Sequence, residues 1–234
     1  MTRFPWFLTL FTVPALALLI GLGVWQVQRL QWKEGLIDQA EAAATAPPAA
    51  IQTVLAARDP EFRRALIVCP GLATAPFVEL QSIHDGQAGS RLISVCRAPG
   101  VANPFLIDRG FVADTVSARP PVTASSLPLS LLVELRRTPG EGNAMTPPPE
   151  GNRYYARDSA AIATALGVPN ASEFTLFALA SSNPELGALT ASAPPAAFAN
   201  NHLGYAMTWF GLAIALVGFY VALLRRRLKP KEPS

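Results

Sequence analysis

Two long apolar stretches, one near each end of the chain, dominate the pattern of hydrophobic and polar residues. Residues 7–27 and 205–224 contain no Lys, Arg, Asp or Glu. A helix that spans a bilayer needs about 20 such residues, so both stretches are long enough to cross a membrane. The first stretch is longer than the apolar part of a signal peptide, and no small-residue cleavage site follows it. We therefore expect a retained helix there, kinked or loosened at Pro14.

Between these stretches the pattern changes to short apolar runs separated by turn residues, which is typical of β-strands. Strands are expected at residues 63–69, 76–83, 90–98, 104–112, 127–137 and 173–180. Many short strands with little helix predict a mainly antiparallel β domain, either a barrel or a sandwich. The expected fold class is thus a membrane protein in which two antiparallel transmembrane helices flank an extracytoplasmic, β-rich domain.

Turn and cap residues mark two features inside this domain. His84-Asp85-Gly86 predicts a hairpin turn between the second and third strands. Residues 158–168 predict one helix, with Asp158 or Ser159 as its N-cap and Gly167 at its end. His84 is then expected to be an exposed turn residue, because polar residues are common in turns.

Charge predicts the orientation of the two spans. Arg225-Arg226-Arg227 directly follow the second span, and positive residues that flank a span stay on the cytoplasmic side. Arg29 and Lys33 follow the first span on the other side, but the cluster at the tail is denser. The expected segments are a cytoplasmic N-terminus (1–6), a first span (7–28), a connector (29–50), the extracytoplasmic β domain (51–199), a second span with a polar N-terminal end (200–224) and a basic cytoplasmic tail (225–234).

The net charge of +3 belongs to the ends of the chain rather than to the central domain. Residues 36–204 contain 14 acidic and 11 basic residues, so the domain itself is slightly acidic. A basic surface for nucleic acid is therefore not expected, and membrane lipid is the partner that the composition indicates.

Most sequence signatures of enzymes are missing. The chain contains neither a phosphate-binding loop nor a G-x-S-x-G motif. Its two histidines lie far apart in sequence, so no metal site and no catalytic residue is expected. The best local acid–base pair is Asp108 with Arg109, which an ion pair at a strand edge explains more simply. Cys69 and Cys96 are compatible with a disulfide and equally with two buried thiols.

The polar start of the second span faces the end of the first. Because the spans run in opposite directions, His202 is expected in the same leaflet as Trp25 and Gln26. His202, Tyr205 and Trp209 are spaced three and four residues apart and share one helix face, which predicts an aromatic niche around one imidazole.

This niche has two interpretations. Aromatic belts are normal at membrane interfaces, and Asn or His ahead of a helix can simply cap it. Alternatively, a neutral imidazole is a common axial ligand of haem iron. The aromatic faces would then hold the porphyrin, Arg29 would meet its propionates, and Asn200 or Asn201 would orient the imidazole.

Small residues recur along the second span at intervals of three and four: Gly204, Thr208, Gly211, Ala215, Gly218 and Ala222. Small residues at this period allow a second helix to approach closely. We expect this seam to pack against Ala17, Gly21 and Gly23 of the first span, with contact to another protein's helix as the alternative.

Both helix ends resemble the Surfeit locus protein 1 family of cytochrome oxidase assembly factors. The resemblance rests on "GVWQVQRLQWKEGLI" (23–37) and "NNHLGYAMTWFGLA" (200–213), with weaker matches at "LIDRGFVAD" (106–114) and at 134–158. It covers nearly the whole chain in the same order. The chain departs from the family at 111–113, where Phe-Val-Ala stands in place of the more usual Trp-Val-Pro.

The resemblance implies a role in inserting haem a into the catalytic subunit of a haem–copper oxidase. It implies haem binding through His202, with Tyr205, Trp209, Trp25 and Arg29 as the accompanying site residues. The expected partners are that subunit and, as a second candidate, haem a synthase. Almost nothing precedes the first span, so a bacterial plasma membrane is the expected location. A scaffold that binds no haem is the alternative, and a membrane-tethered enzyme is the least favoured class.

Overall fold

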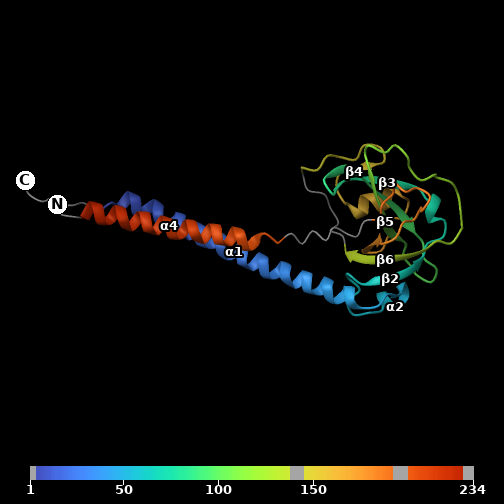
Figure 1. The fold of residues 1–234 in the computed structure, drawn as a ribbon, viewed down its shortest axis with the longest axis horizontal. Coiled ribbons are helices and arrows are strands. Elements are labelled where there is room, and N and C mark those ends of the chain that lie inside the picture. The colour runs from blue at the N-terminus through green and yellow to red at the C-terminus, as the bar shows by residue number, and fades with distance from the viewer. Residues whose placement is uncertain (1–3, 138–144, 192–199, 229–234) are drawn as a thin grey trace, which may run out of the picture. The chain divides into compact units, whose positions relative to one another are not determined.

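The computed structural model describes residues 4–137, 145–191 and 200–228 of the chain. These residues form two compact units (Figure 1). One unit contains Met1–Asp38 and Ala197–Ser234, and the other contains Gln39–Ala196. The first unit is a pair of helices and the second is built around a β-sheet.

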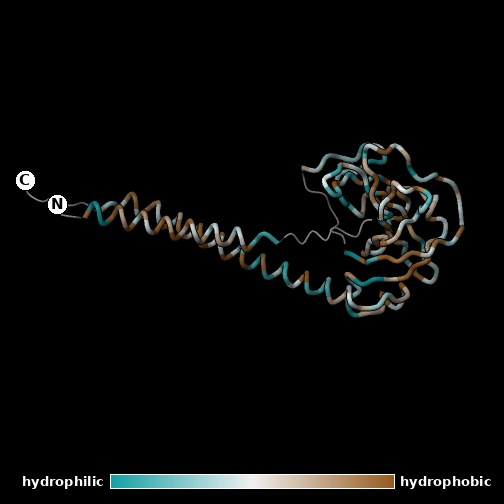
Figure 2. The backbone as a smooth tube through the Cα atoms, in the orientation of Figure 1, coloured by the Kyte–Doolittle hydropathy of each residue, from teal (hydrophilic) through white to brown (hydrophobic). Residues whose placement is uncertain are grey.

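Two long helices, α1 (Trp6–Thr45) and α4 (His202–Leu228), carry the apolar stretches. Both are long and apolar enough to cross a membrane, as the hydropathy colouring of Figure 2 illustrates. The chain is thus a membrane protein with two candidate spans. Helix α1 continues through the Ala-rich half of the expected connector, because alanine favours helix, and it ends shortly before Pro47. Arg225, Arg226 and Arg227 form the last turn of α4.

An eight-stranded sheet forms the second unit, in the order β1-β2-β6-β8-β5-β4-β3-β7. Its strands are β1 (Ala49–Ala50), β2 (Arg64–Val68), β3 (Phe77–His84), β4 (Gln87–Cys96), β5 (Phe105–Ala113), β6 (Ser130–Arg137), β7 (Arg153–Tyr154) and β8 (Phe174–Ala178). Helices α2 (Ile51–Leu55) and α3 (Ser159–Ala165) and the short 3-10 helix η1 (Leu72–Thr74) complete it. The sheet is mixed and open: most long strands pair antiparallel, whereas β8 pairs with β5 in parallel.

The predicted hairpin turn and helix are confirmed. Asp85 and Gly86 join β3 to β4, and their φ angles of 49° and 77° are those of a tight hairpin turn. Asp158 caps α3, because its side chain accepts a hydrogen bond from the backbone N–H of Ala161. Gly167 ends that helix region with a φ of 71°.

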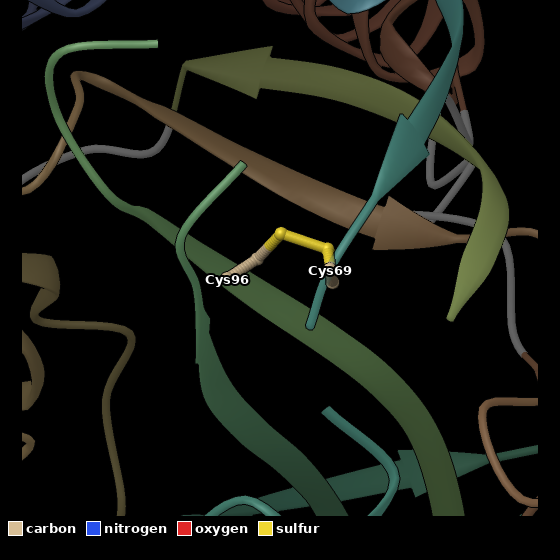
Figure 3. The surroundings of a disulfide bond; sticks show 2 residues. All are labelled: Cys69 and Cys96. Carbon is tan, nitrogen blue, oxygen red and sulfur yellow. A yellow bond between two sulfur atoms is a disulfide. The ribbon is translucent and has the colours of Figure 1, made fainter. Parts of the chain in front are cut away.

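A disulfide bond joins Cys69 to Cys96, so the thiol alternative is wrong (Figure 3). Cys69 follows β2 and Cys96 ends β4, and four inter-strand steps separate these strands in the sheet. Those steps span about 19 Å in a flat sheet. The two Cα atoms are nevertheless only 5.1 Å apart, so the sheet curls strongly over the apolar cluster between them.

The expected ion pair between Asp108 and Arg109 is wrong. Strand β5 is an inner strand, and consecutive residues on it point to opposite faces of the sheet. The Asp108 carboxylate accepts hydrogen bonds from Arg91, at 3.0 Å, and from Arg157, at 2.8 Å. Arg109 is fully buried on the other face, where burial lowers the pKa of its guanidinium to about 10.

Arg109 ties three segments of the sheet domain together. Its guanidinium donates hydrogen bonds to the hydroxyl of Ser182 and to the backbone carbonyl of Ala73, both at 3.0 Å. It also donates to the side-chain oxygen of Asn183. These hydrogen bonds offset the free-energy cost of burying the charged guanidinium. They explain how an arginine can occupy the core.

Candidate functional site

Helices α1 and α4 pack against each other in opposite directions, as predicted. The less exposed residues of α4 recur every three or four positions: His202, Ala206, Trp209, Ala213, Leu216 and Tyr220. On α1 the same spacing gives Thr9, Thr12, Leu16, Leu19, Gly23 and Gln26. This spacing of 3.5 residues is that of a left-handed helix pair.

Hydrogen bonds join the two helices at two levels. The hydroxyls of Thr9 and Tyr220 lie 2.7 Å apart, and Nδ1 of His202 lies 2.6 Å from Oε1 of Gln26. Thr9 and Gln26 are 17 residues apart, or about 25 Å along a helix, which approaches the hydrocarbon thickness of a bilayer. The apolar contact face of the pair therefore lies between one polar tie and the other.

The contact with Gln26 defines the chemistry of the imidazole of His202. An amide oxygen can only accept a hydrogen bond, so this contact requires a proton on Nδ1. Nε2 then carries a free lone pair in the neutral ring, which is the form that binds metal ions. His202 is the first residue of α4, and Gln26 is only 8% exposed on α1.

The other residues of the expected niche lie around this pair without closing over it. Trp25 and Tyr205 are 53% and 57% exposed, whereas Trp209 is half-buried. The guanidinium of Arg29 stacks on the ring of Trp32, one helical turn away, at 3.7 Å. The buried side-chain oxygen of Asn200 has no hydrogen-bond partner in the described part of the chain. The structure thus brings His202 to Gln26, while Trp25 and Tyr205 present free aromatic surface.

Gln26 is expected near His202, but the predicted set of site residues does not include it. Asn200 and Asn201 are the expected partners of the ring, but the amide on Nδ1 comes from the opposite helix. The signal in the sequence is the position of Gln26: it continues the four-and-three spacing of Thr12, Leu19 and Gly23 into a polar residue. A polar residue on the contact face of an apolar helix needs a partner on the neighbouring helix.

The small-residue seam of α4 does not pack against α1. A Cβ added at Gly204, Gly211 or Gly218 would meet no atom within 4 Å, so these positions face away from the pair. On α1, only Gly23 of the expected counterparts is buried; a Cβ there would lie 2.6 Å from the ring of Phe210. The prediction is wrong because a second face of α4 has the same period, and that face, with His202, Trp209, Leu216 and Tyr220, lies toward α1 instead.

A cluster suited to metal binding does not occur among the described residues. No three His, Cys, Asp or Glu side chains come together in that part of the chain. Asp108 and Arg109 are engaged in separate buried networks. The helix ends are therefore the place where the structure offers a free ligand atom beside exposed aromatic rings.

Fold and site define a class: a protein whose two membrane-length helices bracket a disulfide-bonded β domain, with a single imidazole at the helix ends. The chain belongs to the SURF1 family, whose model matches residues 13–214. It is 30% identical over 235 residues to a SURF1-like protein of Drosophila melanogaster, covering 90% of this chain and 74% of that protein. It is 27% identical over 229 residues to Surfeit locus protein 1 of Mus musculus, covering 90% and 72%.

Proposed function

We propose that the chain is an assembly factor for haem–copper cytochrome c oxidase that binds haem a at the outer membrane interface and aids its insertion into the catalytic subunit. Membership of the SURF1 family supports the assembly role. The observation that carries the haem role is the hydrogen bond that Nδ1 of His202 donates to Oε1 of Gln26, because it leaves Nε2 free to bind iron.

The residues at the helix ends fit a porphyrin chemically. His202 supplies one neutral nitrogen ligand, and Trp25 and Tyr205 supply exposed aromatic surface for a flat apolar ring. Trp209 lies about two turns further along the helix of His202, and Arg29 provides a cation for propionates. Haem a is cargo in this proposal, and a single protein ligand suits transfer because no second ligand has to be displaced. The chain acts as a carrier rather than an enzyme.

The proposed location is a bacterial plasma membrane, with both termini cytoplasmic and the β domain outside. The disulfide supports this orientation, since such bonds persist in oxidising compartments. The arginines of the last turn of α4 support it too. The oxidase catalytic subunit is then the partner at the outer surface, and haem a synthase is the candidate source of the cargo.

A scaffold that binds no haem is the second candidate function. It is favoured by one observation: the hydrogen bond between Gln26 and His202 also ties the two helices together. In that case His202 contributes helix pairing alone, and the two units stabilise an oxidase intermediate.

Replacement of His202 distinguishes the two functions. His202→Ala removes both the ligand and the tie, whereas His202→Asn retains a polar group that can bond to Gln26. The haem proposal predicts that both variants lower the haem a content of the oxidase in membranes. The scaffold predicts that Asn preserves it. His84→Ala, at the partly exposed end of β3, is the control and should leave the content unchanged.

A further inference from the structure

Gln26 has a more specific role than joining two helices. We propose that Gln26 is a positioning residue: it holds His202 in the tautomer with the proton on Nδ1, so that Nε2 is presented to the iron of a porphyrin. This inference rests on the proposed haem role but concerns a different residue, on the other helix.

The geometry of the contact supports this role. Nδ1 of His202 and Oε1 of Gln26 lie 2.6 Å apart, within hydrogen-bonding distance, and Gln26 is buried on an apolar helix. A hydrogen bond in such surroundings is stronger than in water. The neutral side chain of a histidine in water carries its proton mainly on Nε2, which would block that nitrogen. Gln26 therefore reverses the ordinary preference of the ring.

A hydrogen bond that only joined the helices would not need to fix which ring nitrogen carries the proton. The helix pair has a second tie at its other end, where the hydroxyls of Thr9 and Tyr220 meet and no imidazole takes part. At the other tie, Oε1 of Gln26 contacts Nδ1 of His202 and leaves Nε2 available to a ligand. Hydrogen bonds of this kind orient metal-binding histidines, and their loss typically lowers metal affinity about 10- to 100-fold.

The tautomer can be measured directly in the haem-free full chain. The chain has two histidines, so in the His84→Asn variant, labelled with ¹⁵N-histidine and held in detergent, the imidazole ¹⁵N signals come from His202 alone. At a pH where the ring is neutral, we expect the Nδ1–H form. Gln26→Leu should shift the ring to the Nε2–H form, and Gln26→Glu should keep the Nδ1–H form because a carboxylate also accepts. Gln28→Leu, an exposed position on the same helix, is the control.

Titration with ferric protoporphyrin IX then tests the consequence. All four tryptophans lie on the two helices, so their fluorescence reports binding there. Gln26→Leu should raise the dissociation constant about tenfold, and Gln26→Glu should restore the affinity. An Nε2–H ring in the parent chain, or affinity that depends on His202 but not on Gln26, would overturn the inference while leaving the haem role intact. If the tautomer of His202 changes in Gln26→Leu but the parent chain binds no porphyrin, then Gln26 controls the tautomer and the haem role is overturned.

Discussion

Asp108 is the clearest case at the scale of single residues, because one buried carboxylate holds two guanidiniums. Its side chain is fully buried, and Arg91 beside it is nearly so. The two arginines that bind it, Arg91 and Arg157, lie 17 and 49 positions away from Asp108 in sequence. The sequence suggested Arg109 as the partner because it is adjacent, but alternation along an inner strand sends the two side chains to opposite faces. Sequence proximity alone therefore could not predict the pairing.

Asp108→Asn should destabilise the β domain strongly, because it leaves the charges of Arg91 and Arg157 without a counter-ion. Breaking a buried pair in this way costs about 3–5 kcal/mol. Differential scanning calorimetry of the detergent-solubilised chain measures the change. Asp114→Asn removes a half-exposed carboxylate and should cost less than about 1 kcal/mol. Equal losses for the two variants would contradict the pairing.

Glu79 makes a pH-dependent contribution. Burial would raise the pKa of Glu79, but two hydrogen bonds from Arg119, at 3.0 and 3.1 Å, outweigh it and hold the pKa below the ordinary 4.5. A lowered pKa in the folded state stabilises the fold fully above that ordinary value, and this contribution is lost as the pH falls below it. Glu79→Gln should therefore lower the melting temperature at neutral pH, with a difference from the parent chain that shrinks below pH 4.5. The same difference at every pH would be inconsistent with this assignment.

At the scale of elements, local signals predicted more than long-range ones. The hairpin of Asp85 and Gly86 and the cap of α3 depend on a few neighbouring residues, and both are confirmed. The two-residue strands β1 and β7 left no alternating pattern to find, since each exists only through its pairing partner. Likewise, the small-residue face of α4 and the face of His202 and Tyr220 both have the period of a packing surface. Only the structure shows which of them contacts α1.

The contact face of the helix pair makes a specific prediction. Gly23→Leu should separate the helices near Phe210, because even a Cβ at Gly23 would overlap the phenyl ring. Gly21→Leu is the matched control, since a Cβ there meets no atom within 4 Å. Spin labels at Val24 and Leu203, both exposed, allow pulsed EPR to measure the distance between the helices. We expect a broadened, longer distance for Gly23→Leu alone; broadening in the control as well would count against this packing.

At the scale of the whole molecule, the disulfide and the arginines of α4 make the orientation testable. Single cysteines at Ile83, in the β domain, and at Leu228, at the end of α4, are exposed for labelling. In intact spheroplasts a membrane-impermeant maleimide should modify the cysteine of Ile83→Cys at once and that of Leu228→Cys only after lysis. The two native cysteines, Cys69 and Cys96, form a disulfide with each other and therefore do not react with the maleimide. The reverse order of labelling would place the β domain in the cytoplasm and remove the outer haem site.

The most direct test of the account is the absorption spectrum of the detergent-purified chain from cells that make haem a. We expect haem a to copurify with the parent chain and with His84→Ala, and to be lost from His202→Ala. The apolar face between the two polar ties is unchanged in that variant, so its helices should still pair. Equal haem a in the parent chain and in His202→Ala would contradict the proposal that this imidazole carries the cargo.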